Sequence, residues 1–373
     1  MSTPKRVVIV GGGILGTMHA LLAQRAGWDV RHLDRDLEPR GATVRNFGLV
    51  WVSGRAPGAE LDAALRARAL WSSIATDAPG VGFRPDGSLT VVTTEAERAV
   101  LEQVCARDDA DRRGFDLLDG TGARRCNPAV TGPVLAALHC RTDAVVEPRH
   151  ALPALRDLLA AGGGYEWRPG RAAAAIGTGR VVDQEGEVHD GDVVIVCPGA
   201  VPDGPVAELL AGAPLRRVQL QMLQTAPLGN TLPTSLADGD SLRYYPAFDV
   251  PARADLPPQE DLAAEFALQL LVSQRSTGAL TIGDTHRSEE PFDFALDERP
   301  TAELVTRAEA VLGRALPPIA RRWSGVYSQR TDGAICHRDE PLPGVWAVTG
   351  AGGRGMTLSP AIAETTLALA LAS

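Results

Sequence analysis

Short apolar runs that end in glycine-rich turns stand near both ends of the chain. Residues 7–10 precede Gly11-Gly12-Gly13 and Gly16, and residues 345–348 precede a second glycine-rich turn at 350–355. Short runs of β-branched residues bounded by turn residues are typical of buried parallel strands. We therefore predict a strand–turn–helix unit at each end, the first with a helix that opens at Ile14 and ends at Gly27.

The pattern of apolar positions predicts further elements between these two units. Strands are predicted at 29–34, 192–196, 218–225, 268–274 and 279–282, and a β-hairpin around a Pro-Asp-Gly turn over 81–92. Helices are predicted at 59–73, 95–107 and 148–161, the last with Pro148 in its first turn.

Buried parallel strands are predicted near both ends, whereas residues 216–282 contain several separate strand-like segments. This difference indicates an α/β fold in two parts. We predict a Rossmann-like cofactor-binding domain formed by residues 1–78, 146–213 and 331–373. Residues 79–145 and 214–330 are predicted to form an inserted α+β substrate domain with an antiparallel sheet.

Composition excludes several classes of function. A net charge of −9 argues against nucleic acid or an anionic membrane as the main partner. No apolar run approaches the roughly 20 residues that span a bilayer, and the first strand begins too early to leave room for a signal peptide. The five cysteines form no CxxC pair, so we expect a cytoplasmic protein with reduced thiols and no metal site.

Lysine chemistry is also excluded. Lys5 is the only lysine of the chain, and it precedes the first predicted strand. Schiff-base catalysis with pyridoxal phosphate therefore has no plausible residue.

The first glycine turn carries the spacing of a dinucleotide site. Gly11-x-Gly13-x-x-Gly16 follows a strand and opens a helix, and Asp34 ends the next strand 18 residues after Gly16. Such an acid accepts hydrogen bonds from a ribose, while the helix N-terminus meets the pyrophosphate. Alone the motif can be a packing turn, but a second glycine turn near the C-terminus suits a larger cofactor that also carries a flavin. We predict FAD.

The same motifs identify a family. The chain resembles the D-amino-acid-oxidase-like superfamily of FAD oxidoreductases, which includes glycine and sarcosine oxidases. The similarity covers nearly the whole length: the first glycine turn, Asp34, Cys197-Pro198-Gly199, the segment 323–327 with Asp332-Gly333, and the segment 353–360 continuing to Glu364. Arg45-Asn46-Phe47-Gly48 and Gly283-Asp284-Thr285-His286 resemble a branch associated with phosphonate catabolism.

The resemblance implies a set of cofactor contacts. The first turn would bind the pyrophosphate, Asp34 the ribose, and the C-terminal turn the pyrimidine edge of the flavin, where negative charge develops on reduction. The cofactor-binding residues expected on this basis are Gly11, Gly13, Ile14, Leu15, Gly16, Asp34, Arg35, Asn46, Phe47, Gly48, Leu49, Cys197, Pro198, Gly199, Gly352, Gly353, Arg354, Gly355, Met356 and Thr357.

Three positions depart from the family pattern. Tyr327 stands where glycine-oxidase-like members have the arginine that grips the substrate carboxylate. Thr281 replaces a lysine that assists oxygen reduction in sarcosine-oxidase-like members. Gly325 replaces a cysteine that attaches the flavin, so we expect FAD to bind non-covalently.

An anionic substrate would then need other partners. The candidates for the substrate side are Tyr327, Arg354, His286, Arg330, Arg243 and Tyr245. Arginine and histidine together would suit a phosphonate dianion, because guanidinium forms strong charge-assisted bonds to phosphoryl oxygens. Phe47 and Trp51 are interpreted as packing groups beside the flavin, the alternative being an aromatic cage for an alkylated ammonium.

The function predicted is FAD-dependent oxidation of a small amine, with hydride transfer to the flavin and hydrolysis of the imine. The specific expectation is 2-aminoethylphosphonate or its N-methyl derivative as substrate, with O2 or another electron acceptor. One alternative is a D-amino acid or glycine oxidase that acts on simple amino acids. The other is a flavoprotein that passes electrons to a protein partner.

Overall fold

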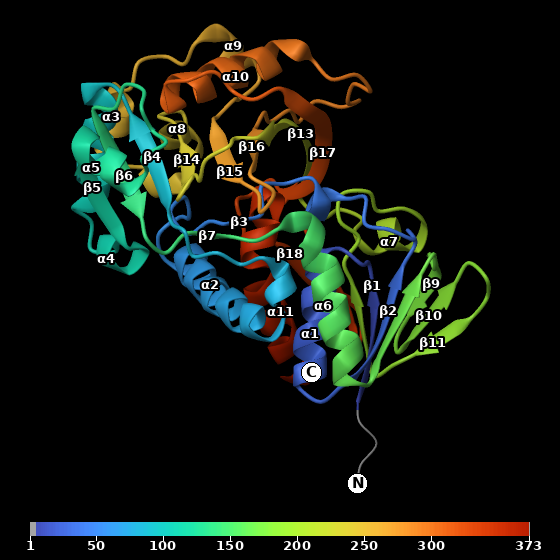
Figure 1. The fold of residues 1–373 in the computed structure, drawn as a ribbon. Helices are drawn as coiled ribbons and strands as arrows, with labels where there is room; N and C mark the ends of the chain where they lie inside the picture. Colours follow the sequence, from blue (N-terminus) through green and yellow to red (C-terminus); the bar gives the residue numbers. More distant parts are fainter. Residues whose placement is uncertain (1–4, 373) are drawn as a thin grey trace.

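The computed structural model describes residues 5–372. Residues 1–4 and 373, which the predicted domain boundaries include, lie outside the described residues. Two large sheets dominate the structure, one of six strands and one of eight, and Figure 1 shows the eight-stranded sheet above the six-stranded one. Among residues 5–372, no helix combines the length and the apolar character needed to cross a bilayer.

The six-stranded sheet has the predicted Rossmann-like arrangement. Its strand order is β18-β19-β12-β1-β2-β8, parallel except for the edge strand β18. The strands are β1 (Arg6–Val10), β2 (Asp29–Asp34), β8 (Tyr165–Pro169), β12 (Val193–Val196), β18 (His337–Leu342) and β19 (Val345–Thr349). The strands of both glycine-turn units thus lie in one sheet, separated only by β12, although they are more than 300 residues apart in sequence.

Four helices pack together beside this sheet. They are α1 (Ile14–Arg25), α2 (Ala59–Asp77), α6 (Pro148–Gly162) and α11 (Gly355–Ala372), and α1 contacts both α6 and α11 (Figure 1). Trp71 of α2 is fully buried and donates from Nε1 to the Met356 carbonyl at 3.0 Å, which ties the C-terminal turn to the core. A small sheet of β9 (Ala173–Gly177), β10 (Arg180–Asp183) and β11 (Val188–Asp190) lies at the edge, next to α7 (Gly204–Leu209).

The eight-stranded sheet is largely antiparallel, in the order β17-β13-β16-β15-β14-β4-β6-β5. Its strands are β4 (Ser88–Val92), β5 (Phe115–Asp119), β6 (Ala136–Cys140), β13 (Leu215–Pro227), β14 (Ser235–Ala237), β15 (Leu271–Gln274), β16 (Ala279–Gly283) and β17 (Ile319–Arg330). The helices in this part of the chain are α3 (Glu95–Cys105), α4 (Ala110–Arg113), α5 (Gly120–Cys126), α8 (Ser241–Tyr244), α9 (Asp261–Glu265) and α10 (Glu298–Leu312).

The α/β fold class predicted from the sequence is confirmed. Every strand of the six-stranded sheet lies within the three segments assigned to the cofactor domain, and every strand of the eight-stranded sheet within the other two. The short pair of β3 (Leu49–Val50) and β7 (Ala144–Val145) joins residues from the two sets. The exact domain boundaries stay a prediction.

The predicted β-hairpin over 81–92 is wrong. Residues 79–81 form a 3₁₀ turn, and Arg84 bridges to Val145 instead of to β4. β4 pairs with β6 and β14, so its partners come from distant parts of the chain. The chain does not reverse at Pro85-Asp86-Gly87: Arg84 pairs with Val145 and Ser88 with Cys140, so residues 84–88 run in one direction beside residues 140–145. Long-range pairing decides which strand lies beside β4.

Candidate functional site

A cavity of about 1020 Å³ lies between the two large sheets. Its wall includes the turn after β1, the end of β2, the loop before β3, the turn after β12 and the start of α11. The eight-stranded sheet contributes β13, β17 and the loop that follows β16. Both glycine turns therefore face the same space.

Close backbone contacts explain the glycines of the first turn. Gly11 has φ +110°, and a Cβ there would lie 2.1 Å from the Cys197 carbonyl oxygen. A Cβ on Gly16 would lie 1.9 Å from the Gly11 carbonyl oxygen. A side chain on Gly11 would push this turn away from the end of β12, and a side chain on Gly16 would push α1 away from the turn. These glycines therefore keep the N-terminus of α1 at the cavity, where it can meet a pyrophosphate.

Asp34 lies beside this turn as the sequence predicts. One carboxylate oxygen accepts from the Gly12 N–H at 2.8 Å and the other from the Asp36 N–H at 3.0 Å. Burial raises the pKa of Asp34. Each carboxylate oxygen has a second lone pair, so Asp34 can still accept from a ribose hydroxyl.

Side chains that the sequence analysis did not identify form hydrogen bonds to the same turn. Arg156 of α6 donates from Nη2 to the Gly12 carbonyl at 2.8 Å, and its guanidinium lies 3.8 Å from the centre of the Trp167 ring. A ring nitrogen of His32 lies 3.0 Å from the Gly11 carbonyl oxygen. Arg156 is separated from Gly12 by 144 positions, and no local pattern could have indicated this contact.

The C-terminal turn is fixed by hydrogen bonds between the Thr357 side chain and the backbone of Leu49 and Trp51. The Thr357 hydroxyl accepts from the Trp51 N–H at 2.9 Å and donates to the Leu49 carbonyl at 3.1 Å. Asn46 closes its own loop: its amide donates to the Ala42 and Thr43 carbonyls and its carbonyl accepts from the Gly48 N–H. These bonds hold in place the loop and the turn that the sequence analysis predicts to contact the flavin.

Most of the predicted site residues line this cavity. On the cofactor side these are Gly11, Gly13, Ile14, Leu15, Asp34, Arg35, Asn46, Phe47, Leu49, Cys197, Pro198, Gly199, Gly352, Gly353, Arg354, Gly355, Met356 and Thr357. Tyr245, His286 and Tyr327 line it on the substrate side. Phe47 and Trp51 are buried in one apolar cluster, as the packing interpretation requires.

Two predicted cofactor residues, Gly16 and Gly48, do not line the cavity. Gly16 packs against the Gly11 carbonyl, and a Cβ on Gly48 would lie 2.0 Å from the Val146 carbonyl oxygen. Both glycines shape the site from behind, through close backbone packing.

Arg243 and Arg330, predicted to hold a substrate anion, are directed elsewhere and do not line the cavity. Arg243 lies in α8, and it pairs with Asp240 and the Pro257 carbonyl. Arg330 forms a two-point ion pair with Asp332. Both guanidinium groups are therefore satisfied by an acidic partner within a few residues along the chain.

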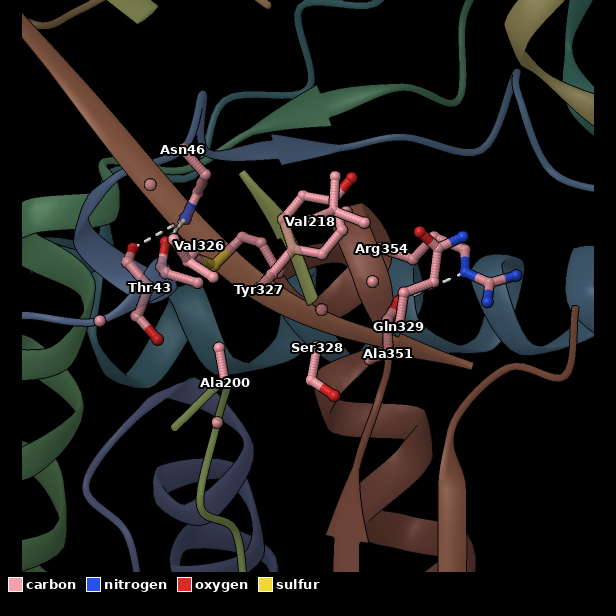
Figure 2. Close-up of a pocket in the computed structure, with 18 of the residues that line it drawn as sticks. Thr43, Asn46, Ala200, Val218, Val326, Tyr327, Ser328, Gln329, Ala351 and Arg354 are labelled. Atoms are coloured by element: carbon pink, nitrogen blue, oxygen red, sulfur yellow. Dashed lines mark hydrogen bonds between the residues drawn. The ribbon is translucent and has the colours of Figure 1, made fainter. Parts of the chain in front are cut away.

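Arg354 does line the cavity, and each of its three guanidinium nitrogens donates one hydrogen bond to the protein. Nη1 donates to Glu60 at 3.1 Å, Nη2 to the Ala334 carbonyl at 2.8 Å, and Nε to the Ala351 carbonyl at 3.3 Å. Figure 2 shows Arg354 and Tyr327 on the same wall, with Asn46 beyond Tyr327. The Tyr327 hydroxyl is buried near the Tyr244 phenol, and it has no partner with hydrogen-bond geometry among the described residues.

Arg55 is a cavity residue that the sequence analysis did not single out. Its side chain is 6% exposed, Nε donates to the Trp51 carbonyl at 2.8 Å, and the guanidinium lies 6.0 Å from the centre of the Tyr245 ring. A carboxylate oxygen of Glu60 is 3.6 Å from Nη1 and is already bound by Arg354. Within residues 5–372 the terminal nitrogens of Arg55 therefore lack a hydrogen-bonded partner and remain available to an anion.

The positions that depart from the family pattern are placed as follows. Gly325 lines the cavity, while Thr281 is buried on β16 away from it. Cys197 is the one cysteine in the wall among the described residues, and burial raises the pKa of its thiol. A protonated thiol is a weak nucleophile, so non-covalent FAD remains our prediction.

The residues present fit FAD. A helix N-terminus and an acidic side chain stand at one end of the cavity, and a second turn with backbone N–H groups stands at the other. An extended cofactor with a ribose, a pyrophosphate and a flavin has complementary groups in that order.

Comparisons with known proteins agree with this geometry. A family profile described as FAD dependent oxidoreductase matches residues 6–369. An opine oxidase subunit of Agrobacterium tumefaciens (strain Ach5) is 25% identical over 363 residues, 92% of this chain and 87% of that protein. The Rhizobium meliloti protein of the same name is 30% identical over 148 residues, 37% of this chain and 40% of that protein.

A solved structure shows the same fold. Glycine oxidase from Geobacillus kaustophilus superposes with a TM-score of 0.79 at 18% identity, covering 99% of this chain and 95% of the other. Three observations lead to one assignment: two glycine turns lie at one cavity, the profile matches almost the whole chain, and the fold is shared. The chain belongs to the family of FAD-dependent oxidoreductases.

Proposed function

We propose that this protein oxidises the C–N bond of a small anionic amine, with 2-aminoethylphosphonate or its N-methyl derivative as the specific substrate. The observation that carries the proposal is Arg55, a buried guanidinium at the cavity whose terminal nitrogens have no hydrogen-bonded partner among the described residues. A buried cation with free donors strongly favours an anionic ligand.

Tyr327 supports a phosphonate over a carboxylate. In the family pattern its position belongs to the arginine that grips a carboxylate, and here it carries a buried hydroxyl without a partner in the described part of the chain. A phosphonate offers three oxygens, which suits a guanidinium and a separate hydroxyl donor better than the two oxygens of a carboxylate do.

The roles of the residues follow from their positions. FAD, when bound, supplies the hydride acceptor. Arg55 would hold the anionic group, Tyr327 would donate to one of its oxygens, and Tyr245 with Trp51 would exclude water from the reacting carbon. Holding the carbon at a fixed place is the main contribution of the protein, because hydride transfer depends on proximity and orientation. The imine product then hydrolyses.

An anaerobic titration tests this proposal. The purified flavoprotein is mixed with 2-aminoethylphosphonate, its N-methyl derivative, sarcosine, glycine and D-alanine while the visible flavin band is recorded. Bleaching by the phosphonates alone is the expected result. Bleaching by simple amino acids would move the protein to the general amino acid oxidases, and no bleaching by any amine would refute amine oxidation.

Electron transfer to a protein partner is the second candidate. Both opine oxidase relatives are named as subunits, and Thr281 stands where the sarcosine-oxidase-like pattern has an oxygen-assisting lysine. Rapid-mixing measurement of flavin reoxidation in air distinguishes the two acceptors. Slow reoxidation after fast reduction by substrate would favour a partner acceptor.

A further inference from the structure

A buried carboxylate, Asp284, lines the substrate side of the same cavity. Asp284 is 5% exposed and follows β16 directly. Its polar neighbours are weakly placed: Gln269 Nε2 is 3.5 Å from Oδ1, and His286 Nε2 is 3.6 Å from Oδ2. No arginine forms an ion pair with it among the described residues, although this chain is rich in arginine. The carboxylate thus lacks a strong cationic partner of its own.

The backbone holds Asp284 firmly in this position. The Asp284 N–H donates to the Gln269 carbonyl at 2.9 Å, and the Gln269 N–H donates back at 3.2 Å. Two residues later, the His286 N–H donates to the Phe266 carbonyl at 2.8 Å. The place of the carboxylate at the cavity is therefore set by the hydrogen-bonded loop that carries it.

The neutral His286 ring presents a nitrogen without a hydrogen to this carboxylate. Nδ1 of His286 lies 3.0 Å from the Ala267 carbonyl oxygen, which can only accept, so Nδ1 carries a hydrogen. In the neutral ring Nε2 then carries a lone pair, and Nε2 is the ring nitrogen beside the Asp284 carboxylate. Two acceptors that lie beside each other can share one added proton.

The other groups around Asp284 are tyrosines and Gln269. Tyr244 stacks on His286 with ring centres 4.4 Å apart. Burial is the largest cause of the raised pKa of the Tyr245 and Tyr327 phenols, and the Asp284 charge acts in the same direction. Burial also raises the pKa of Asp284 itself, and His286 acts in the opposite direction. A carboxylate with this environment is a better proton acceptor than a solvated one.

Arg55 and Asp284 both lie near Tyr245. The Tyr245 ring centre is 6.0 Å from the Arg55 guanidinium, and its hydroxyl is 3.5 Å from Gln269 Nε2, which contacts Asp284. The cavity therefore presents a cation with unused donors and an anion without a strong cationic partner, both near Tyr245. This arrangement complements a short zwitterion, whose anionic and ammonium groups are separated by a few bonds.

We propose that Asp284, paired with His286, binds the ammonium group of the substrate and takes its proton before hydride transfer. This inference rests on the proposed function. In the step, an N–H bond of the ammonium breaks and an O–H bond forms on Asp284, while the electron pair stays on nitrogen. Nothing is oxidised or reduced. The lone pair left on nitrogen is what allows the neighbouring carbon to release a hydride as the imine forms.

The test compares wild type with Asp284→Asn in anaerobic rapid mixing between pH 6 and pH 10, using an amine that reduces the wild-type flavin. At pH 7 we expect the variant to be reduced at least about tenfold more slowly at low amine concentration. The deficit should shrink toward about pH 10, where an alkylammonium loses its proton in solution. Ethylphosphonate, which lacks the amine, should bind both proteins with the same Kd within about twofold.

Matched variants make the result specific. Asp293→Asn changes a solvent-exposed carboxylate that pairs with Arg287, and it should leave the pH profile unchanged. His286→Gln removes the shared proton site while keeping Asp284, so it should shift the acidic limb of the profile. This second variant carries the test if Asp284→Asn does not fold.

The outcomes separate the two proposals. Equal pH profiles for wild type and Asp284→Asn would overturn the role of Asp284 and leave amine oxidation standing. Weaker binding of ethylphosphonate by the variant, with no change in pH profile, would show a structural role only. A wild-type flavin that no amine reduces would refute the proposed function, and this inference with it.

Discussion

Two arginines share one carboxylate at the cavity. Glu60 is hydrogen-bonded to Arg354 and lies 3.6 Å from Arg55, so the three side chains carry a net positive charge of one. Each nitrogen of the Arg354 guanidinium donates one hydrogen bond to the protein, whereas only Nε of Arg55 does, so Arg55 has more donors to spare. At the scale of single residues, this difference is why we propose Arg55 as the group that binds the anion.

Replacing Arg55 tests that conclusion. Arg55→Gln should raise KM for an anionic amine about 10- to 100-fold, because charge-assisted hydrogen bonds contribute about 1.5–3 kcal/mol. FAD should stay bound, which the visible spectrum checks. Arg354→Ala should also raise KM, since Glu60 would then be left to neutralise Arg55. Unchanged KM in Arg55→Gln would remove this residue from substrate binding.

Two buried histidines predict how stability responds to acid. Burial lowers the pKa of His19 from 6.5 to about 4 and that of His32 from 6.5 to about 3. The unfolded chain binds protons at these sites from about pH 6.5 downward, whereas the folded chain does not, so the free energy of unfolding should fall as pH falls from about 6.5 to 4. Each histidine can contribute up to about 3 kcal/mol, at about 1.4 kcal/mol per pKa unit.

Urea unfolding at a series of pH values measures this effect. His19→Gln should flatten the slope between pH 6.5 and 4, while His150→Gln, at an exposed position, should keep it. An identical slope in wild type and His19→Gln would show that other groups cause the acid sensitivity.

At the scale of elements, close backbone packing in the strand–turn–helix unit at residues 6–25 positions the predicted pyrophosphate site. Gly11 approaches Cys197 after β12, and Gly16 in α1 approaches Gly11, so closely that neither glycine can be exchanged without moving one of these elements. The same argument explains why Gly16 shapes the site without lining it.

Gly16→Ala probes this element. Its Cβ would meet the Gly11 carbonyl, so α1 must shift, and we expect a loss of about 1–3 kcal/mol of stability and at least about tenfold weaker FAD binding. Gly177→Ala is the control, because a Cβ there has no neighbour within 4 Å. Flavin fluorescence titration measures affinity, and wild-type affinity in Gly16→Ala would contradict the steric account.

At the scale of the whole molecule, the cavity lies between two large sheets that share no strand. Residues from both parts of the fold line it, so a ligand that fills it contacts both at once. Such a ligand stabilises the folded state without binding the unfolded chain.

Thermal unfolding with and without FAD tests this coupling. Free FAD at about a thousand times its Kd should add about 4 kcal/mol and raise Tm by several degrees, with Tm rising further with FAD concentration. ADP, which matches only the first turn, should raise Tm less. A Tm that does not depend on FAD would contradict a cofactor that bridges the two sheets.

Features of the fold that depend on neighbouring residues could be predicted from the sequence, whereas features that depend on distant residues could not. The strand at 29–34, the helix opening at Ile14 and both glycine turns follow from neighbouring residues, because β-branched runs, helix starts and glycine turns are local signals. The pairing of β4 could not be predicted, since it takes its partners from residues 136–140 and 235–237.

By itself, the sequence determined the α/β fold class, the cofactor and most of the turns that line the cavity, because these depend on motifs whose spacing is local. Only the tertiary structure decided which charged side chains reach the cavity. Arg243 and Arg330 look suitable along the chain but find local acidic partners, whereas Arg55 and Asp284 are left with open donors and acceptors. The physical reason is that burial and pairing belong to residues brought together from distant segments, and no local pattern records them.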